Sequence, residues 1–552
     1  MSNIEDQLLK IKHQAEEREA KRKAETTGLG YLDLNLAPIE TDALQLIPEA
    51  EARRLQVAPI QLKGHDLVVA VFDPENPEAQ KLLADLKIKG YLLKVTVVSL
   101  VGLERAWSFY QYVSPAKTTI TSRFDIEKIH LEELLKKLTN FEAVAGEINN
   151  FDFQKSPTGW ILEIILAGAL ANRSSDVHLE PEAEMIKVRF RVDGILHDVV
   201  SNLARSVYSQ LLNRIKLLSN LKLNIQHEPQ DGRFTIGLTG KEIEARVSLV
   251  PSEFGETVVM RLLDPEVIKM SLTDLGLRAD DLEIINQELK QPNGMILNSG
   301  PTGSGKTTTL YAFLQAKQSP EIKIITIEDP IEYHLAGVEQ TQVSAEYDFA
   351  NGLRSIMRQD PDVILVGEIR DKETAEIAMQ AALTGHLVFS TVHANNAAGV
   401  IPRLLDLDIK PVTIGPALNL VIAQRLVRRL CDSCKKTMTM TDDWKNKIEK
   451  VLSELPARVN KTPYQDIKVF GTAGCDQCNN TGYRGRIGVY ELLKVDKQLE
   501  EFINKESGEA AMEELAKKQG MVTMQQDGLL KVLTGVTTLE EVEAVTGLIL
   551  NN

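Results

Sequence analysis

The chain has few cysteines, few aromatic residues and no apolar run long enough to cross a membrane. Four of its 552 residues are cysteine, and aromatic residues make up 5%. The longest apolar stretch, residues 161–170, carries Glu163 and is far shorter than the roughly 20 residues that a bilayer requires. The N-terminus is charged and has no apolar signal-peptide core. We therefore expect a cytosolic chain that reaches a membrane only through a partner.

The sequence also lacks an excess of positive charge. With 63 lysines and arginines against 78 aspartates and glutamates, its formal net charge is −15. Binding of nucleic acid over a whole surface needs clustered basic residues that displace counterions, so we expect no nucleic-acid partner. The hydrophobic content of 43% is that of an ordinary globular protein, and the length predicts several domains.

What the sequence does contain is a phosphate-binding loop of the pattern G-x-x-x-x-G-K-[ST]. Its residues are Gly300, Pro301, Thr302, Gly303, Ser304, Gly305, Lys306 and Thr307, followed by Thr308 at the start of a helix-compatible run. The glycines let backbone N–H groups point at phosphate oxygens. Lys306 would reach the β- and γ-phosphates, and the Thr307 hydroxyl would bind Mg²⁺. The loop therefore predicts binding of a nucleoside triphosphate, with ATP and Mg²⁺ as the expected cofactors.

Three further apolar runs end in side chains suited to nucleotide chemistry. The run 322–327 leads to Glu328 and Glu332, the run 363–367 leads to Glu368, and the run 387–392 leads to His393. Ligands of open α/β sheets bind at the carboxyl ends of the strands, so we expect these side chains to converge on the nucleotide. Glu368 would support Mg²⁺ and His393 would sense the γ-phosphate. The alternatives are ordinary acids at strand ends and a structural histidine.

The four cysteines form two C-x-x-C pairs, Cys431 with Cys434 and Cys475 with Cys478, separated by 40 residues. Four thiolates in this form suit tetrahedral zinc, although the separation exceeds that of the usual zinc ribbons. A site closed by four sulfurs leaves no position for water, so we predict structural Zn²⁺ that holds an insertion, residues 431–486, together. A redox-active pair and disulfides are the alternatives.

Hydrophobic patterns predict an α/β protein of three folded parts. Residues 1–113 would form a charged leading helix, ending near Gly28, and a small N-terminal α/β domain. Residues 114–148 have the composition of a linker with one helical stretch at 131–138, residues 149–268 form a second domain, and residues 269–552 carry the nucleotide site. We expect strands at 67–72, 95–98, 186–192, 242–250 and 257–263, and a helix at 161–171.

With these motifs in order, the chain resembles the secretion ATPase superfamily, in particular the assembly ATPases of type IV pili and type II secretion. Residues 300–307 match the family's Walker A motif, 325–332 its Asp box, 360–370 its atypical Walker B motif and 384–393 its His box. The resemblance covers nearly the whole chain. It implies a RecA-like P-loop NTPase motor domain, a preceding PAS-like α/β domain, a small N-terminal domain similar to that of type II secretion ATPases, and a zinc-knuckle insertion.

Residue roles follow from the same resemblance. It implies that Glu332 orients the attacking water and that Glu368 supports Mg²⁺ through water. Residues 230–233 and 245–248 match segments of the PAS-like domain whose arginines approach the nucleotide when that domain closes. Arg233 and Arg246 are therefore expected to be arginine fingers, which stabilise charge on the transferring phosphoryl group. The alternative is that each arginine only pairs with a surface acid.

The resemblance also implies a place in the cell. Retraction ATPases of the superfamily are shorter and lack the first domain and the four-cysteine insertion, so the presence of both favours pilus assembly. We expect a cytoplasmic homohexamer docked at the inner membrane on a platform protein, with a cytoplasmic adaptor bound to the N-terminal domain. A type II secretion motor is the alternative.

The sequence also bears on two rival functions and on one further ligand. A regulator that binds ATP without hydrolysing it is a rival, and the two acids Glu332 and Glu368 count against it. A DNA-transport motor is another, and the acidic net charge counts against that. Some relatives bind cyclic di-GMP through a repeated Arg-Leu-Gly motif, and this sequence has no such pair of motifs.

Overall fold

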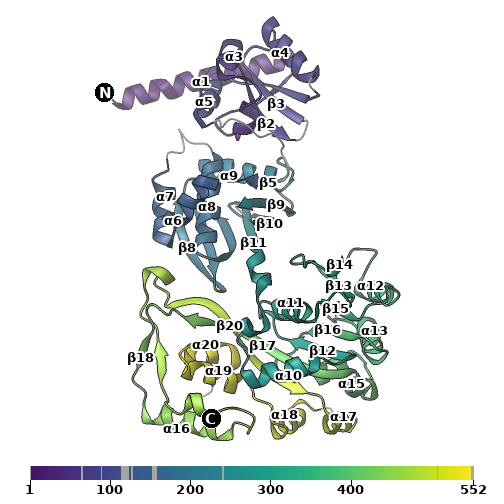
Figure 1. Ribbon diagram of the computed structural model, residues 1–552. Coiled ribbons are helices and arrows are strands. Elements are labelled where there is room, and N and C mark those ends of the chain that lie inside the picture. Colours follow the sequence, from purple (N-terminus) through teal and green to yellow (C-terminus); the bar gives the residue numbers. More distant parts are fainter. Residues whose placement is uncertain are drawn as a thin grey trace. The chain divides into compact units, whose positions relative to one another are not determined.

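A computed structural model of the chain describes residues 2–63, 66–88, 90–112, 123–125, 128–151, 158–238, 241–505 and 508–548 (Figure 1). The chain divides into two compact units, Met1–Asp264 and Pro265–Asn552. Among the residues described, no helix combines the length and the apolar character needed to cross a bilayer.

The first unit begins with the long helix α1 (Ser2–Thr27), which is the expected charged helix and ends at Gly28. A four-stranded sheet of order β1-β4-β3-β2 follows. Its strands are β1 (Gly30–Tyr31), β2 (Val57–Lys63), β3 (Asp66–Val71) and β4 (Leu92–Val97). The helices are α2 (Thr41–Leu44), α3 (Glu49–Leu55), α4 (Pro77–Ile88) and α5 (Leu100–Ser108). Buried side chains from β2, β3 and α5 form one core, so this part is a small α/β domain with β3 and β4 where strands were expected.

A second sheet in the first unit has seven strands in the order β5-β9-β10-β11-β6-β7-β8. They are β5 (Arg123–Asp125), β6 (Ser174–Pro181), β7 (Ile186–Val192), β8 (Ile195–Leu203), β9 (Gln230–Leu238), β10 (Lys241–Ser252) and β11 (Gly255–Leu263). Helices α8 (Thr158–Ala171) and α9 (Arg205–Leu218) contribute to its core. The expected helix at 161–171 and the three expected strands are confirmed as α8, β7, β10 and β11.

Residues 123–149 differ from the expected linker. β5 pairs with β9 in the seven-stranded sheet, and helices α6 (Lys128–Lys137) and α7 (Phe141–Asn149) follow it. Leu138 and Val144 are fully buried in the same core as α8. The segment is polar on average, but its apolar residues recur at helical spacing and are enough to anchor two short helices.

The second unit is built on a seven-stranded sheet of order β14-β13-β15-β16-β12-β17-β20. Its strands are β12 (Gly294–Ser299), β13 (Ile324–Glu328), β14 (Glu339–Gln342), β15 (Val363–Val366), β16 (Leu387–Val392), β17 (Leu418–Leu430) and β20 (Tyr483–Lys494). Neighbouring strands run parallel except β17 and β20, which are antiparallel. Every residue of β12, β13, β15 and β16 is buried, as expected for parallel strands covered on both faces.

Two layers of helices provide that cover. Met295 and Leu297 of β12 share a core with α12 (Phe349–Ile356), α13 (Lys372–Leu383), α14 (Val400–Asp406) and α15 (Pro411–Ala417). Ile296, between them, lies in a separate core with α10 (Ala279–Leu289) and α11 (Lys306–Lys317). This alternation along β12 shows that the sheet is the middle of three layers. Packing on both faces fixes the position of β12, and so of the loop that follows it.

An insertion connects β17 to β20. It contains β18 (Lys436–Met438), α16 (Asp442–Glu454) and β19 (Val469–Gly471). Its apolar side chains, including Ile448 and Val469, pack with α19 (Met524–Leu533) and α20 (Leu539–Thr546) in a small core of their own. The two cysteine pairs lie at the two ends of this insertion.

Candidate nucleotide and metal sites

The phosphate-binding loop joins the carboxyl end of β12 to the N-terminus of α11. Gly300, Gly303 and Gly305 have φ angles of 153°, 80° and 89°, which lie in the region that glycine tolerates best. A Cβ atom on Gly300 would lie 2.6 Å from the carbonyl oxygen of Gln424, so the close approach to β17 also requires glycine there. The first turn of α11, which starts at Lys306, offers its positive end to an anion in this loop.

Lys306 folds back over the loop. Its Nζ donates hydrogen bonds to the carbonyl oxygens of Gly300, at 2.7 Å, and Pro301, at 3.1 Å. Burial is the main cause of the lowered pKa of Lys306, and the charge of Arg425 lowers this pKa further. The charge of Glu368 raises it in part. The ammonium group therefore lies near both of these side chains and rests on backbone carbonyls that phosphate oxygens can replace.

Glu368 and His393 come together at the ends of neighbouring strands. Oε2 of Glu368, just beyond β15, is 3.6 Å from Nε2 of His393, just beyond β16. The same carboxylate pairs with Arg370, and the Glu368 side chain is only 13% exposed. The structure thus brings together Lys306, Glu368 and His393. Arg370 had no role in the sequence analysis, although it lies inside the Walker B-like segment.

The two acids after β13 differ in their surroundings. Glu328 is buried, and its Oε1 accepts hydrogen bonds from Thr326 Oγ1, at 2.6 Å, and Gln340 Nε2, at 3.1 Å. Its other oxygen accepts from the hydroxyl of Tyr311 in α11. Glu332 is partly exposed, and its charge adds to burial and Glu328 in raising the pKa of Tyr311. Glu328 is therefore a fully engaged buried acid, whereas Glu332 lies beside α11 with access to solvent.

A buried hydrogen-bond network beneath the loop has Gln424 at its centre. Gln424 Oε1 accepts hydrogen bonds from Asn298 Nδ2 in β12 and Thr309 Oγ1 in α11, both at 2.9 Å. Its Nε2 donates to the hydroxyl of Tyr490, at 3.4 Å. These bonds join the strand before the loop, the helix after it and both strands beyond. The network was missed in the sequence analysis because its hydrogen-bonded pairs are up to 126 residues apart and form no motif.

The two arginine-finger candidates are cross-strand neighbours in the first unit. Arg233 of β9 is directly opposite Arg246 of β10. Arg246 Nε is 3.3 Å from Glu244 Oε1, whereas the exposed Arg233 side chain has no ion pair within the described part of the chain. Like charges placed directly opposite repel each other, so this pair of arginines favours a nearby anion.

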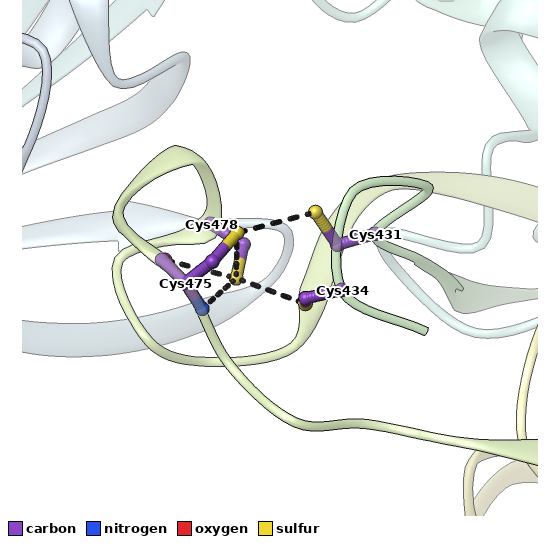
Figure 2. Close-up of side chains that lie close together, drawn as sticks. All are labelled: Cys431, Cys434, Cys475 and Cys478. Carbon is purple, nitrogen blue, oxygen red and sulfur yellow. Dashed lines mark hydrogen bonds between the residues drawn. The ribbon is translucent and has the colours of Figure 1, made fainter. Parts of the chain in front are cut away.

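The four cysteine side chains form one compact cluster, drawn from the two ends of the insertion (Figure 2). The Sγ distances are 3.8 Å for Cys431 to Cys475, 3.8 Å for Cys434 to Cys478 and 3.7 Å for Cys475 to Cys478. A tetrahedron with zinc–sulfur bonds of about 2.3 Å has edges of about 3.8 Å. The cluster therefore fits a zinc ion, and all four cysteines are free of disulfides.

Backbone groups around the cluster support thiolate ligands. The N–H groups of Cys475 and Gly482 each donate to Cys478 Sγ at 3.2 Å. Desolvation opposes ionisation of Cys478, but these donors prevail and lower its pKa. A Cβ on Gly474 would lie 2.8 Å from the Asn480 carbonyl oxygen, and its φ of 81° also suits glycine. The knuckle is thus shaped for a metal by its backbone as well as its sulfurs.

A phosphate loop at the end of a central parallel strand, with an acid and a histidine at the ends of the adjacent strands, defines a P-loop nucleoside triphosphatase. Comparison with known proteins narrows this class. The family described as Type II/IV secretion system protein matches residues 154–544, more than half of the chain, so the chain belongs to that family. The MshEN domain matches residues 27–101, within the small N-terminal α/β domain.

Individual relatives are similar over most of the chain. The type IV pilus assembly ATPase PilB of Myxococcus xanthus is 37% identical over 520 residues, which are 93% of this chain and 88% of the relative. The type II secretion system ATPase E of Vibrio cholerae is 43% identical over 423 residues, covering 75% of this chain and 82% of the relative.

A solved structure shares the fold. The ATPase DotB of Legionella pneumophila aligns with a TM-score of 0.51 at 21% identity, over 70% of this chain and 95% of that protein. The ATPase DotB of Yersinia pseudotuberculosis aligns with a TM-score of 0.52 at 19% identity, over 71% of this chain and 95% of that protein. The α/β fold expected for the motor domain is therefore shared with these two solved ATPases.

Proposed function

We propose that this protein is an ATP-hydrolysing motor that powers the assembly of type IV pili. The observation that carries the proposal is the convergence of the phosphate loop, Lys306, Glu368 and His393 at one edge of the central sheet. The similarity to PilB over almost the whole chain supports the choice of pilus assembly.

Each residue of the site has a separate role in the proposed hydrolysis. Lys306 exchanges the carbonyls of Gly300 and Pro301 for the β- and γ-phosphates of ATP. The exposed hydroxyl of Thr307 would bind Mg²⁺, and Glu368 would support the ion through water. Mg²⁺ supplies charge neutralisation on the phosphates when it is bound. Glu332, with its access to solvent, orients the attacking water, and His393 detects the γ-phosphate.

Arg233 and Arg246 act as arginine fingers in the same proposal. Their domain is PAS-like, and its closure on a RecA-like motor domain brings positive charge to the transferring phosphoryl group. The lack of an ion pair at Arg233 among the described residues supports this role, because a surface arginine with a purely structural function would be expected to hold a carboxylate.

The working form is a cytoplasmic homohexamer docked at the inner membrane. Each cycle of hydrolysis moves a platform protein in that membrane, which adds pilin subunits to the filament. The N-terminal domain, residues 1–113, is the binding site for a cytoplasmic adaptor. Zn²⁺, held by Cys431, Cys434, Cys475 and Cys478, stabilises the insertion and takes no part in hydrolysis, because four sulfur ligands leave it no open position.

A type II secretion motor is the second candidate, supported by the 43% identity with the Vibrio cholerae ATPase. Deletion of the gene in its host separates the two. Loss of surface pili with normal protein export, restored by the wild-type gene but not by Lys306→Ala, is the result that pilus assembly predicts. Loss of export with normal pili would contradict it and favour the secretion motor.

A further inference from the structure

Arg425, on β17, lies against the beginning of the phosphate loop. Its Nη1 donates to the carbonyl oxygen of Gln424, at 3.1 Å, and its Nη2 donates to the carbonyl oxygen of Asn395, at 2.8 Å. A Cβ on Gly300 would lie 3.2 Å from Nη1, so the edge of the guanidinium group touches the first residue of the loop. Asn395 is two residues beyond His393. One side chain therefore bridges β17, the phosphate loop and the segment that carries His393.

No carboxylate of the described residues forms an ion pair with Arg425, although its side chain is half-buried. Arg428 of the same strand is different, because its Nη2 lies 2.6 Å from Glu541 Oε1. Glu491 is the acid whose charge favours the protonated form of Arg425 and raises its pKa. However, the two oxygens of Glu491 already accept hydrogen bonds from the N–H groups of Ala397 and Met524.

Lys306, which also contacts Gly300, likewise forms no ion pair among the described residues. It too rests on backbone carbonyls. Burial lowers the pKa of Arg425, and Arg425 in turn lowers the pKa of Lys306, so the two cations oppose each other's charge. Placing two partly desolvated cations beside each other is unfavourable unless an anion compensates for them.

We propose that Arg425 is a second phosphate-binding cation of the loop, which contacts the phosphate chain of the nucleotide together with Lys306. A guanidinium group has five N–H donors, so it can hold the Asn395 carbonyl with one nitrogen and donate to phosphate oxygens with others. The bound phosphate is thereby connected through Asn395 to the His393 segment. This inference rests on the proposed function, since it assumes that the loop binds a nucleotide.

The test is the affinity of full-length protein for a non-hydrolysable ATP analogue, ADP and AMP, measured by titration calorimetry for wild type, Arg425→Met and Arg425→Lys. The matched control is Arg429→Met, on the exposed side of the same strand. Loss of a charge-assisted hydrogen bond to phosphate predicts that Arg425→Met weakens binding of the ATP analogue by about 10-fold or more, with AMP changed far less. Arg425→Lys should recover part of the loss, and Arg429→Met should bind as wild type does.

The melting temperature of the nucleotide-free protein separates binding from structure. Our inference predicts that Arg425→Met melts at about the wild-type temperature, because removal of a partly desolvated charge offsets the loss of the hydrogen bonds to the Gln424 and Asn395 carbonyls. An unchanged affinity for the ATP analogue, or an equal loss for all three nucleotides with a lower melting temperature, would overturn it. Absence of binding by the wild-type protein itself would instead contradict the proposed function.

Discussion

The carboxylate of Glu368 lies 3.6 Å from the imidazole of His393, although the two residues end different strands of the central sheet. Both strands are fully buried and pair in register, so the sheet holds the two strand ends side by side. Under the proposed function, a change at the γ-phosphate that moves His393 would act directly on Glu368, the acid proposed to support Mg²⁺.

This contact predicts that Glu368 and His393 act as one unit. Glu368→Gln should slow ATP hydrolysis by about 100-fold or more, a loss typical of groups that act on the transition state, while the ATP analogue still binds. His393→Ala should slow it as well. Because the two side chains touch, the double variant should lose far less than the product of the two single losses. Phosphate release by the four proteins measures this, and fully multiplicative losses would contradict it.

The arginine pair predicts a separation of hydrolysis from binding. Arg233→Ala should reduce the rate of phosphate release by about 1,000-fold, the lower end of the effect of an arginine finger, with the affinity for the ATP analogue unchanged. Arg246→Ala should likewise slow phosphate release and leave the affinity for the ATP analogue unchanged. Arg54→Ala, which removes an exposed arginine of the N-terminal domain, is the control and should hydrolyse ATP normally. A wild-type rate in Arg233→Ala would leave that arginine without a catalytic role.

The network around Gln424 predicts a loss of stability. Gln424→Leu leaves the buried Asn298 amide and Thr309 hydroxyl without their acceptor. Each buried polar group without a partner costs about 1–3 kcal/mol, so the free energy of unfolding should fall by at least that amount. Calorimetric melting of Gln424→Leu beside Gln287→Leu, an exposed glutamine of α10, checks this. Equal melting of the two variants would show that the network stabilises nothing.

The cysteine cluster predicts one equivalent of zinc per chain, detected by elemental analysis of the purified protein. Cys478→Ser should lose the metal and lower the melting temperature, because Cys478 accepts the backbone N–H donors that shape the knuckle. Ser433→Ala, a control between the first two cysteines, should keep the bound zinc and the wild-type melting temperature. A structural ion also predicts that ATP hydrolysis per folded chain changes little. A redox site would instead show a disulfide on oxidation and no bound metal.

Much of the fold could be predicted because its signals are local. The buried strands β12, β15 and β16 are apolar runs, and the loop after β12 needs glycine for its backbone geometry. Segment 123–149 was harder, because a few apolar residues such as Leu138 and Val144 decide its packing within a polar stretch. The order of strands in the sheet follows from contacts over long sequence distances, and only the family resemblance pointed to it.

The candidate site divides in the same way. Lys306, Glu368 and His393 belong to sequence motifs and are near one another, as the carboxyl ends of parallel strands require. Arg425 and Gln424 belong to no pattern, and their importance comes from neighbours such as Gly300 and Asn298. Arg425 and Arg233 form no ion pair with the residues that the structure describes, and this becomes visible only when the side chains are placed in space.

The central claim is that this chain is an ATP-driven motor, and its most direct test is Mg²⁺-dependent phosphate release by the full-length protein over a series of protein concentrations. Lys306→Ala and Glu332→Gln are measured alongside. Our account predicts a specific activity that rises cooperatively as hexamers form and is absent from both variants. Tight binding of ATP without turnover at any concentration, or wild-type activity in a folded Lys306→Ala protein, would contradict it.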